Sequence, residues 1–253
     1  MKKVGENAIK AHFGRLAKIG NLGSSLGHGF TRAGWSREES EAMEYIKGEA
    51  EKAGLETRYD EIGNLYCRTP GSHKEIVMTG SHLDTVVEGG NYDGAAGVVA
   101  GLEAIKAVMG EGLKKGLELV VWRGEESGTY KLTYKGCKGA FGGKFSADVL
   151  SQTYGGKTLE QAIEEQGFDP GYFRKGKPAL PQRYVDSISG YVELHIEQGN
   201  KLEADKKDIG IVTSIRGPDR YRITVIGEFD HSGATPMGRS TGRTLTSRCR
   251  TFR

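Results

Sequence analysis

Apolar residues recur along this chain with two different spacings, which predict strands and helices in alternation. Short, mostly apolar runs over residues 75–80 and 117–122 are typical of short buried strands. Over residues 93–109 the apolar positions recur at helical spacing, and Asp93 is a favourable N-cap for that helix. Strands that alternate with helices predict an α/β fold with a mixed, largely parallel sheet and flanking helices.

Two further helices are indicated by their first residues. Ser36-Arg-Glu-Glu39 and Thr158-Leu-Glu-Gln161 both have the form of a capping box. In this motif the side chains of the first and fourth residues bond each other's backbone N–H groups. The two helices are expected to end at Gly54 and Gly167, because glycine readily adopts the backbone conformation that closes a helix.

Residues 190–197 alternate as in a strand, which would place Glu193, His195 and Glu197 on one face. Two more strands are predicted over 209–215 and 220–227, joined by the turn signal Gly217-Pro-Asp219. This last pair is expected to begin a separate, β-containing layer. We therefore divide the chain into a first domain over residues 1–208 and the start of a second over 209–253.

Composition and charge narrow the possible partners. The net charge of +3 depends on five arginines within residues 239–253, without which the rest of the chain carries −2, so a nucleic-acid partner is not expected. There is no 18-residue apolar run, which argues against a membrane protein. The three cysteines lack C-x-x-C spacing, and we expect a cytoplasmic location.

Imidazole and carboxylate groups gather at the ends of the predicted strands and at the start of a predicted helix. Together they are the ligand set of zinc and similar divalent ions. Each alone has an ordinary explanation, since H-x-D sequences are common in surface loops and paired glutamates are usually solvated. Their joint placement is what favours a metal site. The candidates are His82, Asp84, Asp93, Glu125, Glu126 and His195.

Two divalent ions close together need a bridging carboxylate, because each of its oxygens can hold one ion. We assign this role to Asp93. His82 and His195 would complete the ligands of one ion, and Glu126 would be a ligand of the other.

The two remaining carboxylates, of Asp84 and Glu125, are assigned catalytic roles other than binding metal. Asp84, two residues after His82, is placed to accept the second N–H of that imidazole. Glu125 would be free to act as general base, passing a proton from water to the leaving nitrogen.

Four motifs resemble those of the hydantoinase/carbamoylase family of dinuclear zinc amidases. They are His82-Leu-Asp84-Thr, Asn91-Tyr-Asp93-Gly, Gly124-Glu-Glu126-Ser and His195-Ile-Glu-Gln-Gly199. The resemblance implies a zinc aminopeptidase-like catalytic domain followed by an α+β lid through which subunits form a homodimer. It also implies two divalent ions per subunit, Zn²⁺ first and Mn²⁺, Co²⁺ or Ni²⁺ as alternatives. Gln198 and the lid residue His231 would contact a small-molecule substrate, with His231 helping to stabilise an oxyanion.

The resemblance implies hydrolysis of a linear amide or ureido C–N bond in a small carboxylate-bearing substrate, such as an N-carbamoyl-L-amino acid or allantoate. The family's last histidine ligand would follow the lid, and no histidine follows His231 here. We therefore expect a C-terminally truncated or frame-shifted chain with an incomplete second metal site. Alternatives are an inactive fragment that keeps residual metal binding and, more weakly, a dipeptidase or aminopeptidase of the wider superfamily.

Overall fold

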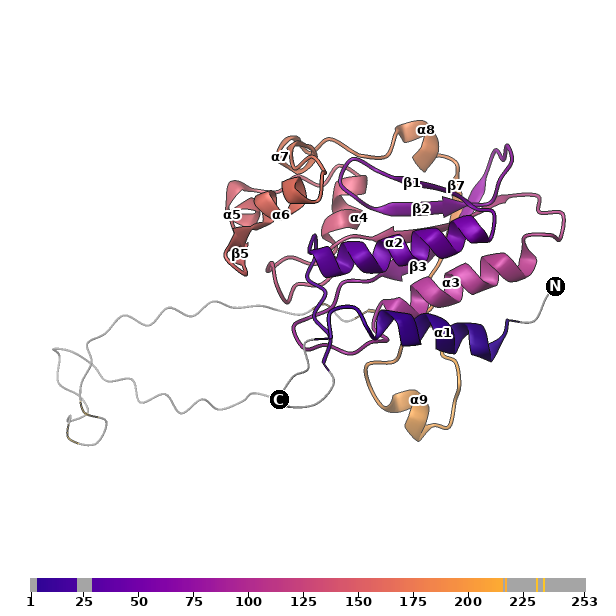
Figure 1. The fold of residues 1–253 in the computed structure, drawn as a ribbon, viewed down its shortest axis with the longest axis horizontal. Helices are drawn as coiled ribbons and strands as arrows, with labels where there is room; N and C mark the ends of the chain where they lie inside the picture. The colour runs from indigo at the N-terminus through magenta and orange to yellow at the C-terminus, as the bar shows by residue number, and fades with distance from the viewer. Residues whose placement is uncertain (1–3, 22–28, 216, 218–230, 232–233, 235–253) are drawn as a thin grey trace. The chain divides into compact units, whose positions relative to one another are not determined.

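The computed structural model describes residues 4–21, 29–215, 217, 231 and 234 of the chain. These residues belong to two compact units, residues 1–199 and residues 200–253. The first unit contains a five-stranded sheet with helices on both of its faces (Figure 1). Among the described residues, no helix is both long and apolar enough to cross a membrane.

The central sheet is mixed, with strand order β1-β2-β4-β3-β7. Strand β3 lies parallel to both β4 and β7, whereas β2 pairs antiparallel with β1 and β4. Both predicted apolar runs form strands at the centre of this sheet, β3 and β4. The strands are β1 (Glu56–Tyr59), β2 (Leu65–Arg68), β3 (Ile76–His82), β4 (Gly116–Trp122) and β7 (Ile188–Val192).

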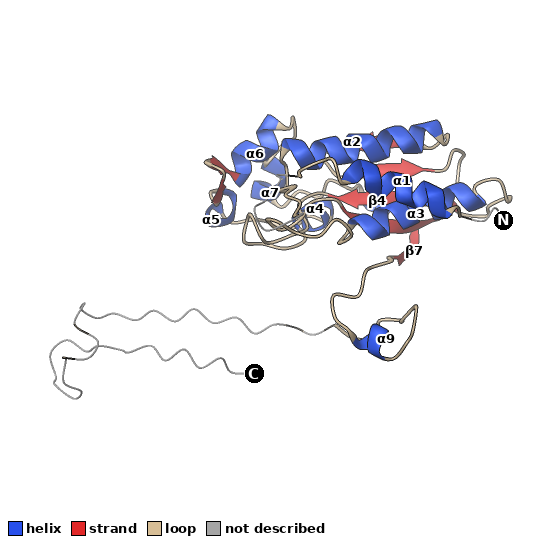
Figure 2. Ribbon diagram, turned by 60° about the horizontal axis from the view of Figure 1, so that its bottom comes forward, coloured by secondary structure: helices blue, strands red, loops and turns tan. Residues whose placement is uncertain are grey.

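One face of the sheet is covered by three helices, α1 (Glu6–Leu16), α2 (Arg37–Lys52) and α3 (Ala95–Val108) (Figure 2). Helix α2 packs on β1 and β2, and α3 packs on β3 and β4. Buried side chains from these elements, among them Ile46, Leu102 and Leu119, form the largest apolar cluster of the described residues. This cluster fixes α2 over β1 and β2, and α3 over β3 and β4, whose ends carry candidate residues.

The opposite face packs against α4 (Lys135–Ala140) and α8 (Gln182–Val185), with Met78, Val120 and Trp122 in a second apolar cluster. A third cluster holds together the segments that follow α4. These are α5 (Ala147–Leu150), β5 (Thr153–Tyr154), β6 (Lys157–Thr158), α6 (Leu159–Glu165) and α7 (Gly171–Lys175).

The two expected capping boxes differ in the structure. At α6 the box is complete, because Thr158 Oγ1 accepts from the Gln161 N–H and Gln161 Oε1 accepts from the Thr158 N–H. At α2, Ser36 Oγ accepts from the Glu39 N–H, but the Glu39 carboxylate is bonded elsewhere. The helix itself starts and ends where the sequence predicts.

The expected N-cap role of Asp93 is wrong. Helix α3 starts at Ala95, and its N-cap residue is Gly94, which has a positive φ of 65°. The Asp93 carboxylate accepts a hydrogen bond from Gln198 and lies beside two histidines. A side chain engaged in this way is not available to cap the helix.

The predicted strand over 190–197 ends early. Strand β7 stops at Val192, the last residue paired with β3, so His195 lies beyond the sheet. After β7 the chain passes over the start of α3, where Gly97 allows the Leu194 carbonyl to approach closely: a Cβ at Gly97 would lie 2.5 Å from that oxygen. The chain therefore leaves the line of the strand, and this path brings His195 beside Asp93.

The second unit contains one short described helix, α9 (Lys201–Ala204). The predicted strand over 209–215 is wrong, since these residues form no regular structure. Their apolar side chains, such as Ile211 and Ile215, are exposed. An alternating pattern makes a strand only when another strand pairs with it. The strand predicted over 220–227 lies outside the described residues.

Candidate metal centre

The candidate site is built at the carboxyl ends of the two central parallel strands. His82 is the last residue of β3, and Glu125 and Glu126 follow β4 by a short turn. Open α/β sheets place their ligands at this edge. His82 is 4% exposed, and its imidazole reaches toward Asp93 and Glu125.

A first group of possible metal ligands consists of His82, Asp93 and His195. Asp93 Oδ1 lies 3.3 Å from His195 Nε2 and 3.9 Å from His82 Nε2. The other oxygen, Oδ2, accepts a hydrogen bond of 2.7 Å from Gln198 Nε2. Residues from three distant segments thus place two imidazole nitrogens around one carboxylate oxygen.

A second group shares His82 and adds Glu125 and Glu126. Glu125 Oε2 lies 3.6 Å from His82 Nε2. Within each group, the atoms that could bind a metal all lie within 4.8 Å of one another. The sequence assigned Glu126 as the ligand and Glu125 as the base, and both carboxylates are close enough to approach an ion beside His82.

Asp84 connects the ends of β3 and β4. Its Oδ1 lies 3.2 Å from His82 Nδ1, which is also 3.0 Å from the Asp84 backbone carbonyl. The same carboxylate accepts the backbone N–H groups of Glu125 and Glu126 at 3.0 and 2.9 Å. Asp84 therefore orients the imidazole and the glutamate turn together.

The site concentrates negative charge around one imidazole. Burial raises the pKa of Glu126 to about 7 against the pull of His82, and the neighbouring carboxylates of Glu125, Asp84 and Asp93 add to the rise. The pKa of Glu125 is raised for the same reasons. Burial opposes charge on His82, but the hydrogen bond and charge of Asp84, together with Glu125, raise its pKa to about 10. Such a cluster favours a bound cation.

The remaining predicted residue, His231, belongs to the second unit, where its Nδ1 accepts a hydrogen bond of 3.1 Å from the Ala234 N–H. Its predicted contact with substrate stays a prediction. Gln198, predicted to contact substrate, hydrogen-bonds Asp93 in the first unit.

The sequence is similar to one known family profile and to several known proteins. Residues 64–152, which include most of the candidate ligands, match the profile described as Peptidase family M28. The chain is 40% identical to allantoate amidohydrolase of Bacillus subtilis (strain 168), over 92% of this chain and 55% of that protein. It is 34% identical to N-carbamoyl-L-amino acid amidohydrolase of Geobacillus stearothermophilus, over 88% of this chain and 54% of that protein.

A solved structure of an amidase is also similar to this chain. The amidase of the hydantoinase/carbamoylase family from Burkholderia vietnamiensis superposes with a TM-score of 0.65 and 30% identity, over 81% of this chain and 48% of that one. The chain belongs to the hydantoinase/carbamoylase family of amidases. It spans about half the length of the relatives that it matches.

The sequence did not point to two buried residues, Lys135 and Glu39, that support the Glu125–Glu126 turn. Lys135 is fully buried, and its Nζ donates to the backbone carbonyls of Glu126 and Leu132, both at 2.7 Å. No local pattern marks a lysine at that position. Glu39 is also fully buried, and its carboxylate accepts the Gly124 N–H just before the glutamate pair. The S-x-x-E motif marked Glu39, but only as a helix cap.

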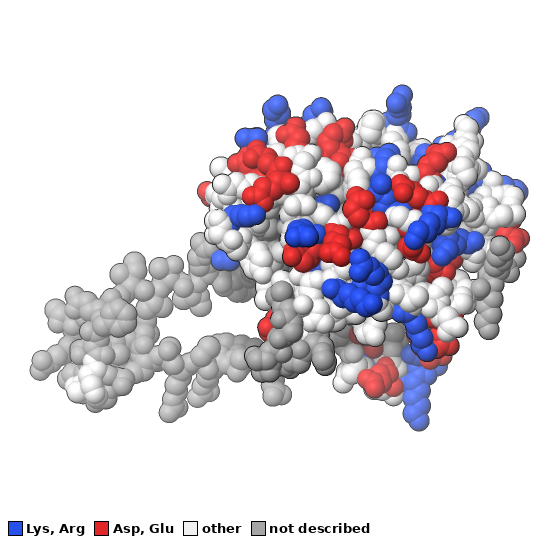
Figure 3. Space-filling view, viewed as in Figure 1, with Lys and Arg blue, Asp and Glu red and all other residues white. Residues whose placement is uncertain are grey.

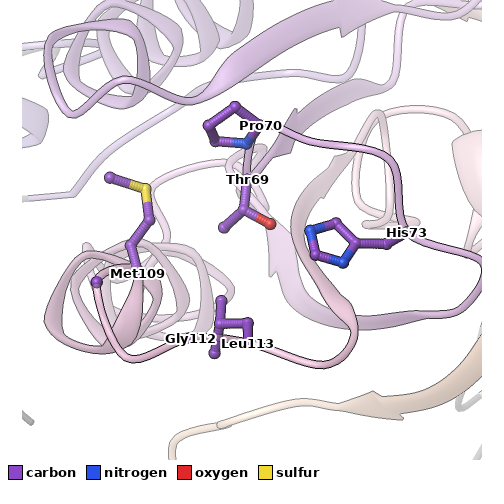
Figure 4. A pocket seen from close by; sticks show the side chains of 7 residues that line it. Thr69, Pro70, His73, Met109, Gly112 and Leu113 are labelled. Carbon is purple, nitrogen blue, oxygen red and sulfur yellow. The ribbon is translucent and has the colours of Figure 1, made fainter.

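A cavity of about 240 Å³ lies elsewhere in the first unit of this protein. It is lined by Thr69, His73, Met109 and Leu113 among others (Figure 4). These residues come from the loops that precede β3 and β4, whereas His82 and Glu125 lie at the opposite ends of the strands. The cavity is therefore separate from the candidate metal centre. On the face seen in Figure 3, the basic and acidic side chains of the described residues are interspersed.

Proposed function

We propose that this chain carries the metal-binding part of an amidohydrolase that cleaves a linear amide or ureido C–N bond in a small carboxylate-bearing substrate. The observation that carries the proposal is the pair of ligand groups that share His82. Histidine with carboxylate is the ligand set of hydrolytic zinc sites. The names of the Bacillus subtilis and Geobacillus stearothermophilus relatives support allantoate or an N-carbamoyl-L-amino acid as the substrate.

The donor atoms fit divalent ions, because nitrogen and carboxylate oxygen suit Zn²⁺, Mn²⁺, Co²⁺ and Ni²⁺ alike. His82, Asp93 and His195 would hold one ion, and Glu126 would hold a second with Asp93 as the bridge. When bound, such ions polarise a carbonyl oxygen and make water more acidic. By analogy with the family, we propose two ions.

Glu125 is proposed as the general base. Its Oε2 would take a proton from the attacking water and deliver it to the nitrogen that leaves as the C–N bond breaks. Burial raises the pKa of Glu125, which brings it closer to the operating range of a proton-transfer group. Gln198 and His231 are proposed to contact the substrate. The expected homodimer and cytoplasmic location stay predictions.

Metal binding is the direct test. The 253-residue protein, stripped of metal and dialysed against Zn²⁺, should retain zinc, and Asp93→Ala should retain much less because both ions lose a ligand. His73→Asn is the matched control, since His73 lines the separate cavity. No zinc in the unaltered protein, or equal zinc in Asp93→Ala, would refute the proposed centre.

Turnover can be measured in a hybrid in which residues 1–199 replace their counterpart in the Bacillus subtilis relative. The hybrid should hydrolyse allantoate or an N-carbamoyl-L-amino acid, and a chelator should abolish the activity. A folded, zinc-loaded hybrid inactive on both substrates would contradict the proposed reaction.

A further inference from the structure

The Glu39 carboxylate does not complete the capping box in which the sequence places it. In α6 the corresponding side chain, Gln161, bonds the N–H of its own N-cap residue, Thr158. In α2 the Glu39 side chain bypasses the N-cap residue. Its Oε2 accepts the Trp35 N–H at 2.5 Å, and its Oε1 accepts the Gly124 N–H at 2.8 Å. One carboxylate therefore joins the start of α2 to the turn after β4.

The turn after β4 presents three consecutive N–H groups to two buried carboxylates. Glu39 accepts the N–H of Gly124, and Asp84 accepts those of Glu125 and Glu126. Both carboxylates are almost completely buried. Charge-assisted hydrogen bonds of this kind are stronger than those between neutral groups.

The carbonyl groups of the same turn also have partners. The backbone N–H of Lys135 donates to the Gly124 carbonyl at 3.3 Å, and that of Tyr134 donates to the Glu125 carbonyl at 2.7 Å. Lys135 Nζ donates to the Glu126 carbonyl. All three N–H and all three C=O groups of residues 124–126 are thus bonded to the protein, while the Glu125 and Glu126 carboxylates lie beside His82.

Glu39 also holds a strained contact. Trp35 has a φ of 55°, a left-handed conformation that is costly for a side chain of this size. Gly124 has a φ of 55° and lies directly against the Trp35 ring, since a Cβ there would stand 2.4 Å from Cζ3. The two residues whose N–H groups Glu39 accepts are therefore packed against each other.

We propose that Glu39 is a positioning residue, which fixes the Glu125–Glu126 turn for metal binding and proton transfer by anchoring the Gly124 amide. The proposal rests on the function proposed for those two glutamates. Glu39 is not one of the candidate metal ligands. It acts through the backbone of Gly124. It is brought there from a helix start 85 residues away in sequence.

Glu39→Gln is a sharp test because the two oxygens have unequal partners. Oε2 receives both the Trp35 N–H and Arg123 Nη1, at 2.5 and 3.1 Å, whereas Oε1 receives the Gly124 N–H. The single oxygen of glutamine will face the two donors. Its NH₂ group will then face the Gly124 N–H, and that hydrogen bond will be lost. Since Arg123 loses its charged partner, Glu39→Asp serves as a second variant that keeps the charge and shortens the reach.

The first measurement is the amide spectrum of the metal-free protein. The Gly124 amide proton, bonded to a carboxylate, should resonate far downfield and should move upfield in Glu39→Gln and Glu39→Asp. Glu38→Gln makes the same charge change on the same helical turn and should leave it in place. An unchanged Gly124 resonance in both Glu39 variants would overturn the proposal, whatever the fate of the metal site.

The second measurement is titration with Co²⁺, whose visible absorption reports on its ligands. Glu39→Gln should lower the Co²⁺ affinity of the site that depends on the Glu125–Glu126 turn by about tenfold or more. The Co²⁺ affinity of the site at Asp93 and His195 should change little. Met43→Ala, which removes a buried side chain from the same helix, controls for lost stability. The two variants are compared at equal loss of Tm. If Met43→Ala and Glu39→Gln then also lower the Co²⁺ affinity of that site equally, Glu39 has only a structural role and the proposal fails. If the unaltered protein binds no Co²⁺, the proposed function fails and the Gly124 resonance still decides the role of Glu39.

Discussion

Gly94 lies so close to His82 that a Cβ added to it would stand 2.6 Å from three atoms of the imidazole ring. Its φ of 65° is also one that residues with side chains rarely adopt. Glycine at this position thus allows Asp93 and His82, which come from two different segments, to lie close together.

Gly94→Ala should therefore weaken Zn²⁺ binding by about tenfold or more, which corresponds to ~1.4 kcal/mol. The methyl group must displace the imidazole or move the Asp93 backbone. The affinity can be measured by competition with a chromophoric chelator.

Gly90→Ala is the matched control, since a Cβ there would meet nothing within 4 Å and the residue has no positive φ. It should bind Zn²⁺ like the unaltered protein. Equal affinities in all three proteins would show that His82 does not need its observed position.

Zn²⁺ affinity should rise with pH. A metal needs the neutral imidazole of His82, whose pKa in the metal-free protein is raised to about 10, so binding releases that proton throughout the neutral range. Below about pH 7, where Glu126 is also protonated, a second proton adds to the slope. Calorimetry in two buffers of different ionisation enthalpy measures the protons released. An affinity independent of pH between 7.5 and 8.5 would contradict this account.

The raised pKa of His82 also determines how the stability of the metal-free protein changes with pH. The pKa of His82 is higher in the folded state than the ordinary value of 6.5, so its contribution is present in full below pH 6.5. The contribution is lost as the pH rises through about 10. Denaturation at several pH values should show this loss in the unaltered protein and not in His82→Asn.

Glu125→Gln should retain metal but lose about 10²–10⁴-fold in turnover in the hybrid that contains residues 1–199, because an amide cannot relay the proton. The assay is product release from allantoate or an N-carbamoyl-L-amino acid, with zinc content measured on the same samples. Glu61→Gln, an exposed glutamate outside the cluster, should leave turnover unchanged. An active Glu125→Gln hybrid would assign the base to another group.

Cys67 should resist alkylation in the native protein. Burial in β2, reinforced by the charges of Glu118 and Glu51, raises the pKa of its thiol to about 12, so little thiolate exists at pH 8. Iodoacetamide followed by peptide mass spectrometry should find Cys67 unmodified until the protein is unfolded in urea. Equal rates in the native and unfolded protein would mean that β2 opens readily.

The sequence predicted those parts of the fold that depend on local pattern. The apolar runs that became β3 and β4 were readable because these strands are largely buried on both faces. Strand β1 was missed, since Glu56–Tyr59 is short, polar and half-exposed. The predicted strand over 209–215 failed because pairing, which a local pattern does not contain, decides whether alternating residues form a strand.

The candidate site shows the same division. Strand ends located His82 and the Glu125–Glu126 pair, and these residues lie together in the structure. Asp93 lies beside His82 and His195, but its predicted role as a helix N-cap is wrong, because its carboxylate faces the two histidines instead of the helix. The double contact of Glu39 could not be read, since one of its partners is 85 residues away.

The fully bonded turn at Gly124–Glu126 also has a consequence for motion. A backbone amide exchanges its hydrogen with solvent only when its hydrogen bond opens, and ordinary surface loops open easily. Here three amides are held by buried carboxylates, so their exchange should be as slow as that of β4 beside them. The two glutamates would then stand on a loop with the rigidity of a strand, and an arriving ion would meet their backbone already in place.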